Sequence, residues 1–346
     1  MVNIIRLVFL VFIFNNHLFS QEQDSKVIMG SCLSSFDLNN KKENLFLKDF
    51  KYLTLPNESK QNVIHPRPKV WRWDRPDELI SFAEKNNILV RLHGPISPQC
   101  SKWAKDDNRT INELENNLTE FLTASCIRYN DSPNVVWMDV VNETILTNGD
   151  WFGPKPGNDK WENPWLQLGL DNNGYPNYIV KAFEIATNHA TNKKLIFNQN
   201  GGMQKEMWDK VKRTILYLKS KGLKVDGIGW QGHLKLGQST YDFVDDFKNQ
   251  IKELSNLIDW AHNNDLEFHI TELDYFIKEG ENLELELEKQ YNIYNEIIEL
   301  LDEKAKNGVV ALNFWDLGVR NKNDKGMFYS IYDKDLMPSA VYQLIN

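Results

Sequence analysis

The 346-residue sequence is poor in cysteine, in basic charge and in long apolar runs. Its three cysteines, Cys32, Cys100 and Cys126, are too few for a disulfide framework, so we expect buried thiols, although one pair could form in an oxidising compartment. The 40 Lys and Arg residues are outnumbered by 48 Asp and Glu, and the net charge is −8. A nucleic-acid binder normally carries a basic stripe, and none is visible, so nucleic acid is not an expected partner.

Signatures of metals and cofactors are also missing. The histidines form no H-x-H or H-E-x-x-H arrangement, which counts against a metal-dependent hydrolase, and no metal is predicted. No glycine-rich phosphate turn follows an early apolar run, so no nucleotide cofactor is predicted either. Eleven Trp and 12 Tyr provide aromatic surface on which a flat, polar ligand could rest.

The N-terminus contains the one long apolar run. "MVNIIRLVFLVFIFNNHLFSQ" has a single Arg, apolar residues at 7–14, and a small Ser20 before Gln21. This run is too short to span a bilayer and predicts a secretory signal peptide over residues 1–20, with an uncleaved lipid anchor as the alternative. We therefore expect a secreted or periplasmic protein, with anchoring at the surface as the alternative. Its mature part, residues 21–346, should be a soluble monomer without a transmembrane segment.

The rest of the sequence alternates between short apolar runs and amphipathic stretches. Helical periodicity appears in "DELISFAEKNN" (77–87), in "WDKVKRTILYLKSKG" (208–222) and in the charged run 279–308, which we expect to be a solvated outer helix. Nearly continuous apolar runs are typical of parallel strands that are covered on both faces. We predict strands over residues 26–32, 52–55, 88–93, 134–142, 194–198, 225–231, 266–272 and 309–315.

Eight alternations of strand and helix in one chain of this length predict a single (β/α)8 TIM barrel. The alternative is an open, doubly wound sheet. One long segment, residues 147–178, is rich in Gly, Pro and Asn and carries Trp151, Trp161 and Trp165. Long irregular loops in compact domains are usually functional, so we expect these tryptophans to contribute to function.

Two carboxylates stand at the ends of predicted strands. Glu143 follows "VVWMDVVN" and Glu272 follows "EFHIT". In a TIM barrel the C-terminal ends of all strands meet at one face, so these distant residues can converge there. Two carboxylates at one mouth are what cleavage of a glycosidic bond requires, one to protonate the leaving oxygen and one to attack the anomeric carbon. Acid pairs at strand ends also occur as structural ion-pair partners, so spacing alone leaves both interpretations open.

The sequence motifs around these carboxylates resemble those of a known family. "WMDVVNE" is similar to the acid/base signature of the family 10 glycoside hydrolases, the endo-β-1,4-xylanases and their relatives, and "ITELD" is similar to their nucleophile signature. "DGIGWQGHL" (226–234), "NFWDLG" (313–318) and the tail "IYDKDLMPSAVYQLI" resemble three further elements of the same family, in the same order. The resemblance runs from about residue 30 to the C-terminus.

The resemblance implies a role for individual residues. Glu143 would be the acid/base, Glu272 the nucleophile, and Asn142 the donor to the 2-hydroxyl of the sugar beside the cleaved bond. His233 would hold the Glu272 carboxylate, and Gln231 would line the same wall. The residues implied to contact the substrate are Asn57, Lys60, His93 and Trp315, to which we add Asn198 of the fifth strand and Trp151 of the long loop.

Each of these assignments has a structural alternative. His233 could be a core histidine bonded to a backbone carbonyl, and Trp315 could serve packing alone. Asn57 and Lys60 could be turn residues that follow a strand.

The sequence also departs from the family pattern. "GPISPQCSKW" (94–103) lacks the family's second histidine and its Trp, and the Glu and Trp of the Asn57 element are Pro56 and Gln61. The fifth-strand element, usually with Asp and Tyr, is "FNQNGG" (197–202), and a second sugar-floor Trp is absent from "RNKNDKGMF" (320–328). The predicted catalytic residues therefore match the family pattern, whereas residues expected to contact the neighbouring sugars differ from it. We expect this difference to change which substrate is preferred.

The predicted function is that of a retaining glycoside hydrolase acting on xylan or a related, plain or modified, plant or algal polysaccharide, without a cofactor. We expect Trp151, Trp161 and Trp165 to influence which oligosaccharide lengths such an enzyme prefers. Burial and the charge of Glu272 should keep Glu143 protonated for the first step. The alternative is a non-catalytic glycan-binding protein on the same barrel, which would not need both carboxylates. N-x-S/T sequons occur at several positions, including Asn57, Asn108, Asn117 and Asn142.

Overall fold

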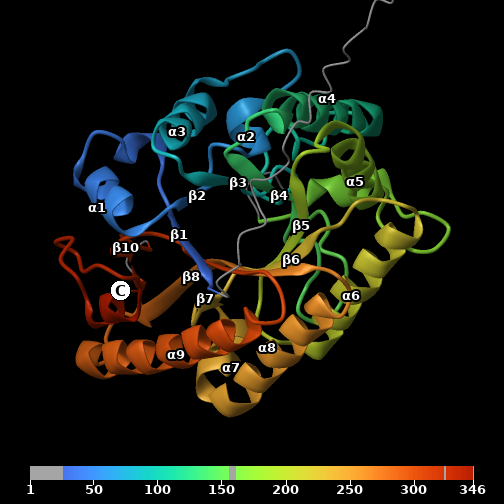
Figure 1. Cartoon of the computed structure of the whole chain (residues 1–346). Coiled ribbons are helices and arrows are strands. Elements are labelled where there is room, and N and C mark those ends of the chain that lie inside the picture. Colours follow the sequence, from blue (N-terminus) through green and yellow to red (C-terminus); the bar gives the residue numbers. More distant parts are fainter. Residues whose placement is uncertain (1–25, 156–160, 323–324, 346) are drawn as a thin grey trace, which may run out of the picture.

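The structure is a computed structural model, and it describes residues 26–155, 161–322 and 325–345. In this part of the chain eight parallel strands close into a barrel, and helices surround it (Figure 1). Each barrel strand pairs with the next, and the last one returns to pair with the first. The barrel strands are β1 (Ile28–Cys32), β2 (Tyr52–Leu55), β3 (Leu89–Leu92), β4 (Val135–Asn142), β5 (Lys194–Gln199), β6 (Gly227–Trp230), β8 (Glu267–Lys278) and β9 (Val310–Phe314).

These strands coincide with the eight apolar runs of the sequence, so the predicted (β/α)8 barrel is confirmed and the open sheet is excluded. Every residue of β2, β6 and β9 is buried. Side chains that point inward fill the barrel, and those that point outward pack against the helices, which explains why the runs are apolar on both faces.

The helical layer follows the barrel in chain order. In α9 the buried residues Ile293, Ile297 and Leu301 recur every four positions, so this long charged helix lies on the barrel through one apolar face, as predicted for the run 279–308. No helix within the described residues is long and apolar enough to cross a bilayer. The helices are α1 (Lys41–Asp49), α2 (Gln61–Ile64), α3 (Asp74–Lys85), α4 (Ile111–Asn130), α5 (Asn177–His189), α6 (Lys205–Ser220), α7 (Gln238–Asp245), α8 (Phe247–His262) and α9 (Leu283–Lys304), with the 3-10 helices η1 (Ser35–Asp37), η2 (Pro164–Leu168) and η3 (Ala340–Ile345).

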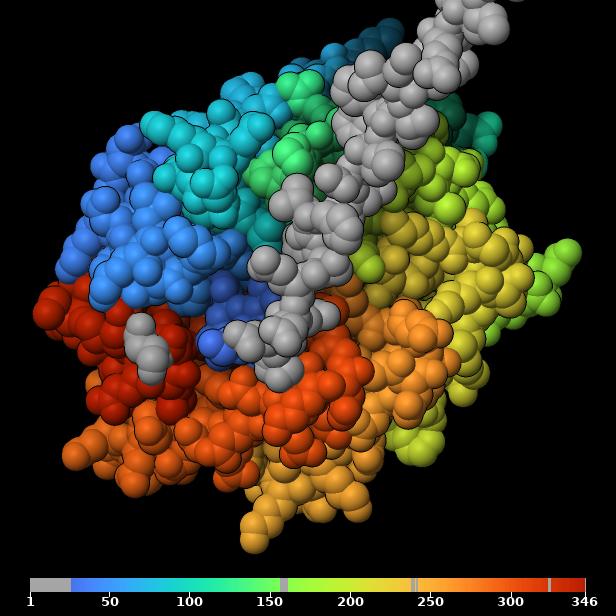
Figure 2. All heavy atoms as spheres, viewed as in Figure 1, coloured from blue at the N-terminus to red at the C-terminus, as the bar shows by residue number. Residues whose placement is uncertain are grey.

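The C-terminal segment packs against the first helix. The space-filling view shows the red C-terminal residues beside the blue residues of β1 and α1 (Figure 2). Tyr342 of η3 donates a hydrogen bond from its hydroxyl to Asp49 Oδ1 at 2.9 Å and accepts one from Lys48 Nζ at 2.6 Å. These contacts join the last described element to the first βα unit and so complete the helical ring.

Strand β8 extends well past the barrel. Its pairing with β9 shifts register between Ile270 and Leu273, and beyond that point β8 pairs with β7 (His233–Leu234) and with β11 (Gly326–Tyr329). β11 in turn pairs with β10 (Arg320–Asn321), so a small ribbon stands over the mouth of the barrel. The predicted end of this strand at residue 272 is therefore wrong, because hydrogen bonding to the ribbon continues the strand to Lys278.

The barrel interior is partly polar. Arg91 is fully buried, and it donates hydrogen bonds from Nε to Tyr52 Oη at 2.6 Å and forms an ion pair with Asp139. Its Nη2 atom also lies 2.6 Å from His269 Nδ1. A buried guanidinium requires such partners, because an unpaired charge in the interior is strongly unfavourable. The candidate site lies above this polar layer of the barrel interior.

Three sequence predictions concern other parts of the fold. Cys32, Cys100 and Cys126 are unpaired and buried, as predicted. The predicted signal peptide, residues 1–20, and residues 156–160 of the long loop lie outside the described residues. The described parts of that loop include η2, where Trp165 is fully buried and donates from its indole nitrogen to Ser97 O at 2.9 Å.

Candidate active site

Strand β4 delivers Glu143 to the mouth of the barrel through an unusual backbone conformation. Glu143 has φ +56°, in the left-handed region that non-glycine residues rarely adopt, and its backbone N–H donates to Asn198 O at 3.2 Å. Gln199 Oε1 accepts from the next backbone N–H, that of Thr144, at 3.1 Å. These bonds from β5 hold the turn, and strain held in this way is typical of functional sites.

A frame of three amides surrounds the Glu143 carboxylate. Gln231 Nε2 donates to Glu143 Oε1 at 2.9 Å, and Asn142 Nδ2 lies 3.3 Å from the same oxygen. Asn198 Nδ2 donates to Asn142 Oδ1 at 2.9 Å, and Gln231 Nε2 lies 3.3 Å from it. Because Asn142 accepts on its oxygen from both neighbours, its NH2 group is turned toward Glu143 and the mouth of the barrel.

Gly229 on β6 makes room for this frame. A Cβ atom at Gly229 would lie 2.2 Å from Asn198 Oδ1, closer than any real contact. The same Asn198 oxygen accepts a hydrogen bond from Thr271 Oγ1 at 2.9 Å. Glycine at this position therefore permits the Asn198 side chain to reach both Thr271 and Asn142 inside the barrel.

The Glu272 carboxylate lies in the same frame, on β8. Glu272 is buried, and its backbone N–H donates to Gln231 O at 2.7 Å. His233 Nε2 lies 3.2 Å from Glu272 Oε2, and His93 Nε2 lies 3.4 Å from Oε1. Asn198 Nδ2 lies 3.4 Å from the same Oε1. Both carboxylate oxygens therefore face donors, an arrangement that favours the ionised form.

Each histidine is itself held by a carboxylate. His233 Nδ1 lies 2.7 Å from Asp274 Oδ1, and His93 Nδ1 lies 2.9 Å from Asp139 Oδ2. Burial alone would lower the pKa of His233, but the carboxylates of Asp274 and Glu272 outweigh it and raise that pKa to about 10. His233 is therefore a cation at neutral pH.

The two glutamates have pKa values shifted in opposite directions. Burial raises the pKa of Glu143, the hydrogen bond from Gln231 opposes this, and the negative charge of Glu272 raises it further. Burial would also raise the pKa of Glu272, but the charges of His93, His233 and Lys60 lower it to about 2. One carboxyl thus tends to keep its proton and the other to lose it, as an acid and a nucleophile require.

A polar cavity lies beside Trp315 at the same mouth of the barrel. Lys60 Nζ donates to Gln99 Oε1 at 2.6 Å, and Gln99 Nε2 donates to Asn57 Oδ1 at 2.8 Å. Lys60 Nζ also lies 5.8 Å from the centre of the Trp315 ring, and Trp315 meets His93 edge to face at 5.1 Å. The cavity has a volume of about 430 Å³ and is lined by Cys32, Ser34, Asp37, Lys42, Pro56, Asn57, Gln99, Trp315, Asp316 and Arg320.

Comparison with known proteins identifies the family. The sequence pattern of glycosyl hydrolase family 10 matches residues 18–346. The chain belongs to this family. Residues 30–346, over which the signature elements occur, lie within the match, so the resemblance found in the sequence is confirmed.

Relatives and solved structures of the family are similar over most of their length. A β-1,4-xylanase of Dictyoglomus thermophilum is 28% identical over 319 residues, which cover 87% of this chain and 82% of the relative. The crystal structure of an endo-1,4-β-xylanase from Caldicellulosiruptor owensensis is 25% identical, with a TM-score of 0.74 over 93% of this chain and 97% of that one. Xylanase 10B of Thermotoga petrophila RKU-1, solved in complex with xylobiose, has the same identity and TM-score over 93% of each chain.

The eleven predicted site residues of this family 10 hydrolase fall into two groups. The side chain of Trp151 has other partners than the rest, although its backbone bridges to Ile145, two positions after Glu143. Its ring contacts Lys210 Nζ at 4.3 Å and Tyr175 at 6.3 Å, and its indole nitrogen lies 3.2 Å from Gly174 O. The other ten meet at the mouth of the barrel, namely Asn57, Lys60, His93, Asn142, Glu143, Asn198, Gln231, His233, Glu272 and Trp315.

The tryptophans of the long loop therefore differ from one another. Trp165 is fully buried, so a sugar contact through this residue is excluded in the observed fold, and our expectation for it is corrected. Trp161 is 48% exposed, with Lys105 Nζ 5.7 Å from its ring centre. Influence on oligosaccharide length remains a prediction for Trp151 and Trp161.

Sequence analysis missed several residues of the family 10 site. Asp274 stands two positions after Glu272, and strand periodicity places both on one face, so this signal was present. Gln99 appeared only as a departure from the family pattern, yet it joins Asn57 to Lys60. Arg320 gave no signal, because its partner Asp274 is 46 positions away and the two meet only through the folded ribbon.

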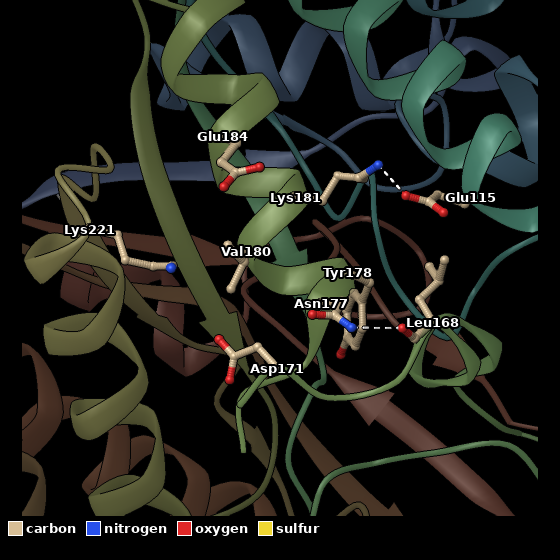
Figure 3. Close-up of a pocket in the computed structure, with 9 residues that line it drawn as sticks. All are labelled: Glu115, Leu168, Asp171, Asn177, Tyr178, Val180, Lys181, Glu184 and Lys221. Atoms are coloured by element: carbon tan, nitrogen blue, oxygen red, sulfur yellow. Dashed lines mark hydrogen bonds and ion pairs between the residues drawn. The ribbon is translucent and has the colours of Figure 1, made fainter. Parts of the chain in front are cut away.

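A second cavity, of about 350 Å³, lies in the helical layer around α5 (Figure 3). Lys181 forms an ion pair with Glu115 of α4, and Asn177 Nδ2 donates to Leu168 O at 2.9 Å. Asp171 and Glu184 also line it. The lining residues come from α4, α5, α6 and the long loop, and none of them is at a strand end, so the candidate active site of this family 10 hydrolase is the barrel mouth.

Proposed function

We propose that this family 10 hydrolase cleaves the β-1,4 linkages of xylan, or of a related plain or modified polysaccharide, with retention at the anomeric carbon. Glu143 is the acid/base and Glu272 is the nucleophile. The observation that carries the proposal is that the two carboxylates share one frame of amides, in which Gln231 Nε2 donates to Glu143 while Asn198 Nδ2 reaches both Asn142 Oδ1 and Glu272 Oε1. The opposite directions of their pKa shifts, upward for Glu143 and downward for Glu272, agree with the two roles. Named relatives that are xylanases, one of them with bound xylobiose, support the choice of substrate class.

The first step forms a covalent glycosyl–enzyme. An oxygen of Glu272 attacks the anomeric carbon while Glu143 gives its proton to the departing glycosidic oxygen, so the leaving sugar departs with a free hydroxyl. Asn142 supplies an N–H to the 2-hydroxyl of the reacting sugar, a bond that strengthens as the ring gains positive charge. His233 and His93 hold the two oxygens of Glu272 and so limit its rotation before attack.

The second step releases the sugar. Once Glu272 is esterified it carries no negative charge, and the upward influence of that charge on the pKa of Glu143 disappears. Glu143 can then accept a proton from water, which attacks the anomeric carbon and frees Glu272. The alternation of Glu143 between acid and base thus follows from the charge of its neighbour.

The glycone side of the substrate occupies the cavity beside Trp315. The Trp315 ring offers an apolar face, while Lys60, Asn57 and Gln99 present donors and acceptors to hydroxyl groups. Pro56 lines this cavity where the family pattern has Glu, so the set of hydrogen bonds to this sugar differs from the family's. Such a change of polar partners alters selectivity among related sugars, which is why the substrate class includes modified xylans.

The test is a substrate panel. The purified protein and its Glu272→Gln variant are incubated with plant and algal polysaccharides, including plain and substituted xylans, and released oligosaccharides are identified by mass. NMR of the first-formed reducing end then reports its anomeric configuration. We expect β-configured xylo-oligosaccharides from the wild type only. Products from both proteins, or α-configured first products, would contradict the assignment.

We also propose that the protein is exported and acts as a monomer. The basis for export is the N-terminal sequence, whose residues 1–20 have the composition of a signal peptide. N-terminal sequencing of protein recovered outside the cytoplasm tests this, and a mature end at Gln21 is the expected result. Light scattering coupled to gel filtration tests the oligomeric state, for which the mass of one mature chain is expected, below the 40.5 kDa of the full 346-residue chain.

A further inference from the structure

One oxygen of Glu272 is held by a chain of three side chains that ends outside the barrel. His233 Nε2 lies 3.2 Å from Glu272 Oε2, and His233 Nδ1 lies 2.7 Å from Asp274 Oδ1. The other oxygen of Asp274, Oδ2, accepts a hydrogen bond from Arg320 Nη2 at 3.0 Å. Each carboxylate oxygen of Asp274 thus has its own cationic partner.

The other oxygen of Glu272 is held by a chain of the same composition. His93 Nε2 faces Glu272 Oε1 at 3.4 Å, His93 Nδ1 faces Asp139 Oδ2 at 2.9 Å, and Asp139 is paired with Arg91. Arg91 is fully buried among barrel residues, where Tyr52 and His269 also hold it. The nucleophile therefore lies between two His–Asp–Arg chains, one internal to the barrel and one reaching its rim.

The rim chain depends on the β10–β11 ribbon. Arg320 is the first residue of β10 and lies opposite Phe328 of β11, and its guanidinium stacks on the Phe328 ring at 4.2 Å. Phe328 packs on Phe276 of β8 with ring centres 5.2 Å apart. The ribbon thereby fixes the direction of Arg320 toward Asp274, although 39% of the arginine side chain is exposed on the cavity wall.

We propose that Arg320 is a positioning residue for the hydrolytic reaction, which it serves by fixing Asp274 and, through His233, the Glu272 carboxylate. The inference rests on the proposed function, because it requires Glu272 to be the nucleophile. Without Arg320 the Asp274 carboxylate loses the partner of one oxygen and can rotate about its Cβ–Cγ bond. His233 then loses its fixed orientation, and Glu272 spends less time in the position for attack.

Arg320 also contributes charge to the site. Removing a cation makes the surroundings of both glutamates more negative, which raises the pKa of each. The acid limb of the pH profile follows ionisation of Glu272 and the alkaline limb follows loss of the Glu143 proton, so both limbs move to higher pH. The other charged or titratable groups that act on the Asp274–Glu272 region include His93, His233, Lys60, Glu143, Cys32, Lys322 and Tyr294.

The test compares three variants in the full-length protein. Arg320→Met removes the hydrogen bond and the charge. Arg320→Lys keeps the charge. Lys322→Met removes a charge from the neighbouring end of the same ribbon, where Lys322 Nζ lies 5.6 Å from the Phe328 ring centre, and it leaves the Arg320 hydrogen bond intact. For each variant, kcat/KM on an aryl β-xylobioside is measured from pH 2 to 9, so that both limbs are sampled, together with the thermal midpoint.

For Arg320→Met we expect a kcat about tenfold lower, of the order that misplacement of a catalytic group produces, and both limbs moved up by roughly half a pH unit. Arg320→Lys should restore the position of the limbs and part of kcat. Lys322→Met should change kcat less than twofold. A lower kcat with unmoved limbs, or an equal effect of Lys322→Met, would overturn the positioning role and leave Arg320 a structural residue.

The activities of the wild type and of Glu272→Gln distinguish failure of the Arg320 role from failure of the proposed function. If wild type and Glu272→Gln hydrolyse the xylobioside equally well, the proposed function fails before Arg320 is tested. If wild type is active, Glu272→Gln is inactive and Arg320→Met behaves as wild type, the proposed function stands and only the role of Arg320 is wrong.

Discussion

At the scale of single residues, Glu143 is half-buried and Glu272 is buried, and the two carboxylates have different neighbours. Glu143 faces amide groups, which carry no net charge, whereas Glu272 faces His93 and His233. The His233 cation stabilises an ionised Glu272 far more than amides stabilise an ionised Glu143, so the same side chain acquires two different proton affinities. The chemistry of the site is therefore set by the residues that contact each glutamate.

Replacement of Glu272 by Gln should abolish turnover without disturbing the fold. Gln has the same shape and can still accept a bond from His233 or His93, but its amide does not form the covalent intermediate. We expect kcat to fall by at least about 10⁴-fold, as for loss of other enzymatic nucleophiles, with an unchanged circular dichroism spectrum. In a Glu272→Gly variant, added azide should fill the vacated space and yield a glycosyl azide of inverted configuration. Normal activity in Glu272→Gln would contradict the assignment of Glu272 as the nucleophile.

Replacement of Glu143 by Gln should change the pH profile. In the wild type the alkaline limb of kcat/KM follows loss of the Glu143 proton, and the raised pKa of Glu143 places that limb above the ordinary glutamate range. Because Gln does not titrate, the alkaline limb should be lost for a substrate whose aryl leaving group needs no protonation. The acid limb, which follows Glu272, should remain below the ordinary glutamate range. An alkaline limb that persists in Glu143→Gln would assign it to another group.

At the scale of secondary-structure elements, the site depends on how closely neighbouring strands approach. β5 and β6 are paired in parallel with Asn198 opposite Gly229. The missing side chain of Gly229 is the space that Asn198 occupies when it bonds Thr271 and Asn142. A small residue on one strand thus determines the orientation of a functional amide on the next.

Gly229→Ala should therefore damage both stability and activity. The added methyl group would lie 2.2 Å from Asn198 Oδ1, so Asn198 must turn away and release Asn142. We expect a destabilisation of about 1–3 kcal/mol, typical of overpacking a core, and a kcat at least about tenfold lower. Thermal denaturation and steady-state kinetics measure the two effects. The control is Gly237→Ala, where a Cβ would meet nothing within 4 Å, and similar losses in both variants would contradict the argument.

At this scale the sequence predicts the barrel strands well and the mouth less well. The eight apolar runs were sufficient to predict eight strands, because strands that are buried on both faces consist mainly of apolar residues. The extension of β8 beyond residue 272 was missed because its partners, β7 and β11, are short strands from distant loops. Arg320 and Gln99 were missed for the same reason, since their roles come from tertiary contacts and leave no periodic pattern.

At the scale of the whole molecule, the buried charges make stability depend on pH. Burial would raise the pKa of Glu267, but hydrogen bonds and charge from His269, a hydrogen bond from Trp137 and the charge of Lys194 lower it to about 2. The pKa of Glu272 is also lowered to about 2. A carboxyl group whose pKa is lower in the folded state than in the unfolded chain stabilises the fold above the unfolded value, near 4.3, and this contribution is lost as the pH falls toward 2.

The free energy of unfolding should therefore decline between about pH 4.3 and pH 2. His233 acts in the opposite sense, because its pKa is raised to about 10. Its contribution is complete below the unfolded value, about 6.5, and is lost as the pH rises toward 10. Urea unfolding at a series of pH values measures both losses. Glu267→Gln should show a smaller decline in the acid range than the wild type, and an identical decline would contradict the role of Glu267.

The burial of Asn117 on α4 also bears on the choice of an expression host. Asn117 is 1% exposed, and its Oδ1 accepts a hydrogen bond from Gln61 at 2.9 Å, yet it begins an N-x-T sequon. Oligosaccharyltransferase in a yeast or mammalian secretory pathway acts on chains before they fold, and a glycan on Asn117 would keep α4 from docking. Asn142, 2% exposed, carries the same risk. Secretion from such hosts should give poor yields that Thr119→Ala and Thr144→Ala improve, whereas bacterial production should need neither change.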